Sequence, residues 1–317
     1  TRFRYVFNLE HSRPRSPAAA DSIRTIAQSD DGALWLGTDN TRLLRYELAE
    51  DRFDDLTPLL GDQAIPPRVT AFAPATAGEL WVATDVGLYL LDPQRRQARH
   101  LAVPGMERQP MRSLAVARDH SLWIGSHGNG AFHYVPDSGK VTHYPYREND
   151  ADGLSFPVVH AIVEDRHGHV WIGTGDGLDV LDPATGKVRH FRHDSNDPAS
   201  LPGNRVRALH VARDGTLWVG THAGLSRVVE AADGSVSFAH PLTGTLNSDM
   251  VPVVFAIAEG PAGRLWLSTQ AGIISFDMGS ERTRSYRLAD GLQDLEFHGG
   301  SMAQHGDGRH VFGGARG

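Results

Sequence analysis

The sequence contains no cysteine, which excludes disulfide bonds and thiolate chemistry. It also lacks any apolar run near the roughly eighteen residues that a membrane-spanning helix requires, so this segment is not expected to contact a membrane. A basic excess is missing too, because 31 Lys and Arg stand against 38 Asp and Glu, a net charge of −7. Nucleic-acid-binding faces normally carry such an excess, so nucleic acid is not expected as a partner.

Tryptophan is also scarce, but its six copies all lie in one recurring motif. The motif consists of an apolar residue, Trp, a second apolar residue, a small residue and Thr or Ser. The copies are LWLGT (34–38), LWVAT (80–84), LWIGS (122–126), VWIGT (170–174), LWVGT (217–221) and LWLST (265–269). The Trp positions are 35, 81, 123, 171, 218 and 266, which are 42 to 48 residues apart. A degenerate copy, HVFGGARG (310–317), has Val311 where Trp is expected. Such spacing indicates a repeat protein.

The segment 158–193 is the clearest repeat, and it predicts four short strands. VVHAIVE, HVWIGT, LDVLD and KVRHFRH are rich in β-branched and apolar residues, and Asp, Gly and Pro separate them. About ten residues before each Trp lies a strand whose third residue is always small. These small residues are Thr25, Ala71, Ser113, Ala161, Ala208, Ala256 and Ser301. An innermost propeller strand, packed between neighbouring sheets near a crowded axis, requires such residues.

These patterns predict an all-β fold, a seven-bladed β-propeller of four-stranded blades. We expect one domain over residues 1–317, with Trp strands near the six positions above and a degenerate one near 311. We expect the strand-like segment 2–7 to close the last blade, which misses one strand at the C-terminus. The Trp side chains should be buried, with each indole N–H donating to a backbone carbonyl. The long connections and the turns after the Trp strands should share one end of the ring, which forms a mouth.

The repeats at 158–193 and 205–225 resemble those of the two-component regulator propeller family. That family occurs in sensor regions of bacterial hybrid histidine kinases and some diguanylate cyclases. The loop 193–206 and the final repeat beginning at 290 are similar to the family's inter-blade loop and last blade. The resemblance extends over roughly residues 20 to 317.

The resemblance implies a periplasmic, ligand-sensing domain within a larger inner-membrane receptor. It implies a carbohydrate-derived or small polar ligand, and a homodimer formed through the receptor. No catalytic residues, cofactors or metal are expected in this domain. A histidine kinase or diguanylate cyclase would lie downstream, and we expect the chain to be a fragment of that receptor.

Two sets of variable residues are expected at the mouth. The first set varies at the second residue of each inner strand, and the second varies in the turn after each Trp strand. The ligand-binding candidates are Arg24, Arg112, His160 and Arg207 from the first set, and Asp39, Asp85, His127, Asp176, His222 and Gln270 from the second. Arginine binds carboxylates in a bidentate manner, so this mixture would suit a sugar acid.

Two other functions stay open from the sequence. One is a propeller enzyme, a lyase or glycosidase acting on a polysaccharide or lactone, since streptogramin lyase-like propellers carry related repeats. A glycosidase would need two carboxylates at one mouth, for which Asp39, Asp85 and Asp176 are available. The other is a protein-interaction scaffold.

Overall fold

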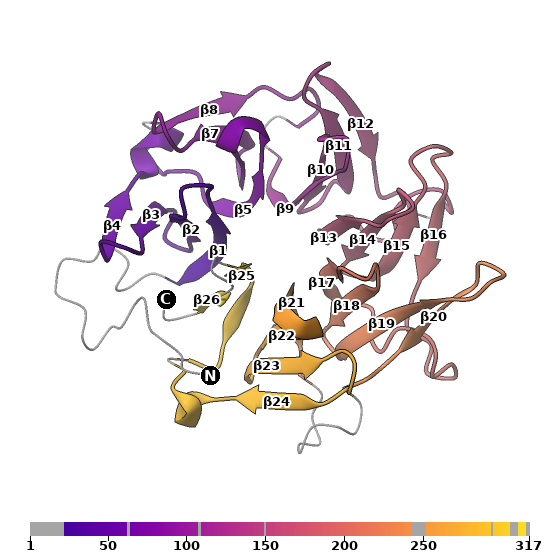
Figure 1. The fold of residues 1–317 in the computed structure, drawn as a ribbon. Coiled ribbons are helices and arrows are strands. Elements are labelled where there is room, and N and C mark those ends of the chain that lie inside the picture. The colour runs from indigo at the N-terminus through magenta and orange to yellow at the C-terminus, as the bar shows by residue number, and fades with distance from the viewer. Residues whose placement is uncertain are drawn as a thin grey trace.

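The computed structural model describes residues 22–61, 64–106, 109–148, 150–242, 252–292, 294–304 and 310–314. These residues form antiparallel β-sheets arranged as blades around a central axis (Figure 1). Within each sheet the strands follow chain order, and the first strand of each lies nearest the axis. No helix in this part of the chain is long and apolar enough to cross a membrane.

Six sheets in the described ranges contain four strands each. The first comprises β1 (Ile23–Gln28), β2 (Leu34–Thr38), β3 (Leu43–Glu47) and β4 (Arg52–Asp55). The second comprises β5 (Val69–Pro74), β6 (Leu80–Thr84), β7 (Leu88–Asp92) and β8 (Gln97–Leu101). The third comprises β9 (Met111–Val116), β10 (Leu122–Ser126), β11 (Ala131–Val135) and β12 (Lys140–Tyr144).

The other three follow the same plan. The fourth comprises β13 (Val159–Glu164), β14 (Val170–Thr174), β15 (Gly177–Leu181) and β16 (Val188–Phe191). The fifth comprises β17 (Val206–Val211), β18 (Leu217–Thr221), β19 (Gly224–Glu230) and β20 (Val236–Ala239). The sixth comprises β21 (Val254–Glu259), β22 (Arg264–Thr269), β23 (Gly272–Asp277) and β24 (Thr283–Tyr286). Short 3-10 helices are η1 (Thr57–Leu60), η2 (Thr76–Gly78), η3 (Pro261–Gly263) and η4 (Leu288–Asp290).

The last repeat corrects the predicted fold. Its described residues form a two-stranded sheet of β25 (Phe297–Gln304) and β26 (His310–Gly314). The prediction of seven four-stranded blades is therefore wrong, because the described chain forms six. The full repeats are 42 to 48 residues long, whereas from position 297 onward the structure describes only 297–304 and 310–314, which is room for two strands. The closing strand predicted at 2–7 lies outside the described residues.

The inner strands contact one another in chain order around the axis. β25 contacts β21 on one side and β1 on the other, so the two-stranded sheet lies between the sixth blade and the first. As predicted, the turn after each Trp strand lies beside the start of the same blade's inner strand. The backbone hydrogen bonds that join them include Asp39 N–H to Ser22 C=O at 3.0 Å, Asp85 N–H to Arg68 C=O at 3.1 Å and His127 N–H to Pro110 C=O at 2.8 Å. We call this end of the ring the mouth.

The Trp side chains form the core, as expected, but their hydrogen bonds differ from the prediction. Five of them are at most 7% exposed, and Trp266 is partly buried. The indole of Trp35 donates to Ser29 Oγ at 3.0 Å, and that of Trp171 donates to Asp165 Oδ2 at 2.8 Å. Both acceptors are side chains six residues before the Trp, so the predicted backbone acceptor is wrong in these two blades.

The fourth residue of each Trp motif, two positions after the Trp, is small and allows neighbouring blades to pack closely. A Cβ atom on Gly173 would lie 2.6 Å from Cγ1 of Val206, the first residue of β17, which is the inner strand of the next blade. A Cβ atom on Gly220 would likewise lie 2.8 Å from Cγ1 of Val254. Real Cβ atoms do not approach so closely, so the packing between these blades requires glycine.

Two blades replace this glycine, and the next inner strand differs accordingly. Ala83 and Ser268 occupy the position in the second and sixth blades. The facing repeat position, elsewhere a β-branched residue, is Met111 after Ala83 and Gly299 after Ser268. Met is flexible and Gly has no side chain, so either leaves room for the larger neighbour.

We predict that Gly173→Ala destabilises the fold by about 1–3 kcal/mol, because the added methyl overpacks the contact with Val206. Urea denaturation followed by circular dichroism measures this free energy. Gly128→Ala is the control, since a Cβ atom there meets no heavy atom within 4 Å. The control should change stability by less than about 0.5 kcal/mol. Equal effects of both variants would contradict the proposed packing.

Candidate functional site

A cavity of about 740 Å³ occupies the central axis and extends to residues of the mouth. Small-molecule sites commonly have volumes of about 300–1,000 Å³. Its walls come from the inner strands, in which alternate residues point to the same side. The second and fourth residues of each strand therefore both face the axis, and the second residue lies nearer the mouth.

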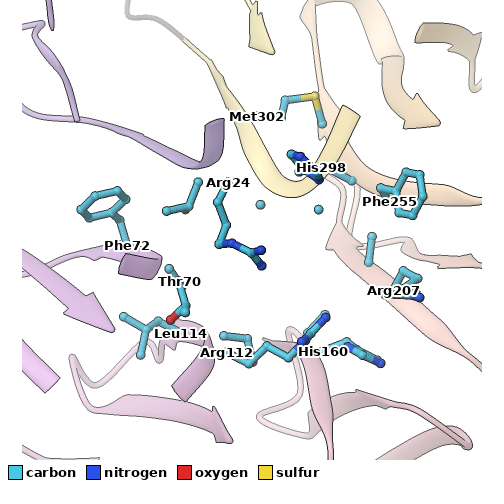
Figure 2. A pocket seen from close by; sticks show the side chains of 18 of the residues that line it. Arg24, Thr70, Phe72, Arg112, Leu114, His160, Arg207, Phe255, His298 and Met302 are labelled. Carbon is cyan, nitrogen blue, oxygen red and sulfur yellow. The ribbon is translucent and has the colours of Figure 1, made fainter. Parts of the chain in front are cut away.

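Two rings of side chains result, one from each of these positions. The upper ring, nearer the mouth, consists of Arg24, Thr70, Arg112, His160, Arg207, Phe255 and Gly300. The lower ring consists of Ile26, Phe72, Leu114, Ile162, Leu209, Ile257 and Met302. Figure 2 shows members of both rings around the same space. The upper ring is mostly polar, whereas every residue of the lower ring is apolar.

Positive charge is concentrated on one arc of the upper ring. Arg112, His160 and Arg207 come from β9, β13 and β17, which contact one another in that order (Figure 2). Neither arginine of the arc forms an ion pair or hydrogen bond with a described residue. Arg24, by contrast, is paired with Asp39, whose Oδ1 lies 2.5 Å from Nη2 and 2.7 Å from Nε. The arc therefore presents unpaired cationic groups to the cavity.

The charges of the arc perturb one another. Burial, and then repulsion by Arg207 and Arg24, lowers the pKa of Arg112. Burial, and then the arginines at 112 and 207, lowers the pKa of His160 to about 3. The imidazole is therefore neutral at pH 7, and its Nδ1 atom is buried without a hydrogen-bond partner among the described residues. Arg207 has an unpartnered buried Nε atom as well. An anion in the cavity would relieve this repulsion.

The structure brings six of the ten predicted site residues to the cavity. Arg24, Arg112, His160, Arg207, Asp85 and His127 all line it. Asp39 does not line the cavity itself, but it forms an ion pair with Arg24, which does. A role of these residues in ligand binding stays a prediction.

The other three predicted residues lie away from the cavity and have other surroundings. Asp176 accepts a hydrogen bond from Asn204 Nδ2 at 3.0 Å. His222 packs over Gly203, and its Nδ1 accepts a hydrogen bond from the Arg205 N–H at 3.3 Å. The Oε1 atom of Gln270 is buried without a partner among the described residues. Two of these side chains thus contact the loop 193–204, whose path the repeat pattern does not reveal.

Several residues of the cavity were missed in the sequence. Arg68, Glu296 and His298 line it near the mouth, just before the inner strands or in β25. The lower ring was missed as well, although its signal was present. Its residues lie two positions after the variable residue of each inner strand, and a strand period of two places them on the same face.

The loop 147–157 is attached to the fourth blade by a buried carboxylate. Asp179, which is fully buried on β15, accepts hydrogen bonds from Ser155 N–H at 2.8 Å and Ser155 Oγ at 3.0 Å. The carboxylate also lies 2.8 Å from Nδ1 of His190, whose Nε2 lies 3.0 Å from the Ala151 carbonyl oxygen. Both ring nitrogens face acceptors, which a protonated imidazole satisfies. The hydrogen bond to Asp179 raises the pKa of His190.

A serine, a histidine and an aspartate also meet where β25 joins the first blade. Ser22 Oγ lies 2.7 Å from Nε2 of His298, and Asp39 Oδ2 lies 3.9 Å from the same nitrogen. A catalytic triad places the carboxylate on the other ring nitrogen, so this cluster does not have triad geometry. Within the described ranges, no group of three or more His, Asp or Glu is arranged to hold a metal ion.

We predict that His190→Gln destabilises the protein more at pH 5.5 than at pH 9. The folded pKa of His190 is raised, so its protonated form stabilises the fold below the unfolded value of about 6.5. This contribution is lost as the pH rises through the raised folded pKa. Urea denaturation at the two pH values measures the difference. His120→Gln, in an exposed turn, is the control and should show no such dependence. A pH-independent effect of His190→Gln would contradict the charged pair.

Solved structures with the same architecture come from several proteins. The extracellular domain of a protein described as a hybrid two-component system from B. thetaiotaomicron has a TM-score of 0.73 and 19% identity, covering 92% of this chain and 38% of that one. Virginiamycin B lyase from Staphylococcus aureus, a catalytically inactive form with quinupristin, has a TM-score of 0.68 and 13% identity, covering 91% and 90%. PorZ, a surface component of the type-IX secretion system of Porphyromonas gingivalis, has a TM-score of 0.66 and 16% sequence identity. The similarity covers 92% of this chain and 46% of PorZ. At these identities the similarity shows the propeller fold alone.

Sequence comparison is more specific. No curated protein sequence matches the chain. The family model described as two component regulator propeller matches residues 18–40, 153–176 and 200–223. Each match covers both the inner strand and the Trp strand of a separate repeat, and two of the matches overlap the segments that predicted this family. Three segments of this chain, each from a separate repeat, are therefore similar to the two component regulator propeller family.

Proposed function

We propose that this propeller is an extracytoplasmic, ligand-sensing domain of a two-component-type signalling receptor. In this proposal a small organic anion binds in the central cavity, and a sugar acid is the candidate that the sequence suggests. The observation that carries the proposal is the cationic arc, in which Arg112 and Arg207 face a cavity of suitable size without acidic partners among the described residues. The family match supports a role in signalling, and one similar structure is an extracellular domain.

The chemistry of the arc suits a carboxylate. A guanidinium group donates two parallel hydrogen bonds to a carboxylate, and such charge-assisted bonds are stronger than neutral ones. His160, neutral at pH 7, adds a hydrogen-bonding group without further positive charge. Because the arginines repel one another when the cavity holds no anion, part of the binding free energy would come from the relief of that repulsion.

The proposal assigns recognition, not catalysis, to this domain. The signalling output would come from a downstream histidine kinase or diguanylate cyclase, and a homodimer formed through the receptor is part of the proposal. Because a lyase has the same fold, an enzymatic function is the alternative to this proposal. Recovery of each bound compound unchanged after prolonged incubation would argue against turnover.

We predict that galacturonate and other small carboxylates raise the melting temperature of this chain. At a hundred times its dissociation constant, a ligand stabilises the folded state by about 2.7 kcal/mol. Arg112→Ala and Arg207→Ala should each weaken binding of a responding compound about tenfold or more in isothermal titration calorimetry, because a charge-assisted hydrogen bond is lost.

Arg95→Ala is the matched control, since Arg95 is an exposed arginine in a turn of the second blade. This variant should bind with unchanged affinity. If no carboxylate binds, or if all three variants bind equally well, the cavity is not an anion site. Turnover of a polysaccharide or lactone by this chain would instead favour the enzyme.

A further inference from the structure

The lower ring restricts the kind of anion that the cavity can hold. Below the arginines, the fourth residues of the inner strands are all Ile, Phe, Leu or Met, and the third residues that line the cavity between the two rings are Ala except for Thr25 and Ser113. The lining residues include none from positions deeper than the lower ring, and we call this deepest ring of the lining the floor. A ligand that enters past the cationic arc meets an apolar floor.

The lower ring is a fixed part of the blades. Phe72, Leu114, Leu209 and Ile257 are each only partly buried, and each packs with its other face against the hydrophobic core of a blade. Because these side chains pack against the blade cores, they cannot rotate out of the cavity wall and uncover polar groups behind them. The surface that they offer to the cavity is apolar and preformed.

The distance between the rings sets the dimensions of the ligand. Two residues along a strand span about 6.6 Å, so the apolar ring lies about that far below the arginines. This spacing accommodates a ring or branched chain joined to a carboxylate by a short linker. A fully hydroxylated sugar acid would instead place most of its hydroxyl groups against the apolar side chains of the lower ring, where desolvation is unfavourable, since Thr25 and Ser113 are the hydroxyl side chains that line the described cavity below the upper ring.

The upper ring also has an apolar side. Phe255 and Gly300 follow the cationic arc around the axis, and Figure 2 shows Phe255 near Arg207. Gly300 has no side chain, so the wall beside Phe255 is recessed. The charged head of a ligand would face Arg112 and Arg207, while its body could pass beside Phe255 towards the floor.

We infer that the cavity recognises an amphipathic organic anion, with a carboxylate at the upper ring and an apolar body at the lower ring. This inference rests on the proposed function, because it takes the cavity to be the ligand site. It goes beyond that function by naming the chemical class, an aryl or branched-alkyl carboxylate in preference to a hydroxylated one of equal charge.

Three probes test the inference by isothermal titration calorimetry on the whole chain. 3-Phenylpropionate carries both features, galacturonate has the carboxylate but a polar body, and 3-phenylpropanol has the apolar body without the charge. We expect 3-phenylpropionate to bind at least about tenfold more tightly than either of the others. Its binding should show a negative heat-capacity change, the signature of buried apolar surface.

Variants separate the two rings. Leu209→Asn keeps the approximate shape of the side chain but makes the floor polar, and it should weaken binding of 3-phenylpropionate about tenfold. Arg112→Ala should weaken it similarly through the loss of the charge. Leu90→Asn is the matched control, a partly buried Leu of the second blade that does not line the cavity, and it should leave the affinity unchanged.

The outcomes distinguish this inference from the proposed function. If galacturonate binds as tightly as 3-phenylpropionate and Arg112→Ala weakens it, the anion site stands and the amphipathic preference is overturned. If 3-phenylpropanol binds as well as 3-phenylpropionate, the carboxylate contributes nothing and both ideas fail. If none of the probes binds at millimolar concentration, both are again overturned. If Leu209→Asn does not fold, the relative affinities of the three probes for the unsubstituted chain still test the amphipathic preference.

Discussion

The close approach of neighbouring blades is the constraint on which the rest of this structure depends. Where Gly173 meets Val206 and Gly220 meets Val254, there is no room for a further carbon atom. These contacts help to bring the inner strands against one another around the axis. Because the strands start at the same end, their equivalent side chains lie at a common depth. The two rings of the cavity are therefore a consequence of blade packing.

Repetition of the scaffold leaves the character of the cavity to the two axis-facing positions of each inner strand. At the upper position the side chains range from Arg to Phe and Gly, so the cavity has a charged side and an apolar side. The buried cations of the arc are unfavourable on their own. His160 reduces the repulsion by remaining neutral, and the arginines keep their charge for an anion. Strain of this kind, held by a rigid scaffold, is typical of binding sites.

Much of the fold could be predicted from the sequence because its signals are local and repeated. The Trp motif and the small third residue of the inner strand identified the blades and the mouth. Counting blades from repeats failed at the last one, since the motif at 310–314 is present but its described residues form only two strands. Six predicted residues reached the cavity, but Asp176 and His222 did not, because contacts with Asn204 and Gly203 occupy them. Those contacts depend on the path of one loop.

By itself, the sequence determined the propeller repeat, the resemblance to the two-component regulator propeller family and the variable position at which arginines and a histidine gather. These properties follow from spacing and residue type along the chain. Only the tertiary structure decided that Arg112 and Arg207 have no acidic partner in the described part of the chain while Arg24 has Asp39, and that an apolar ring lies below them. The physical reason is that the cavity wall joins residues on different blades, whose equivalent positions are more than forty residues apart, and that Arg24 and Asp39 meet from different parts of one blade, 15 positions apart. Their distances are set by packing around the axis and not by neighbours in the sequence.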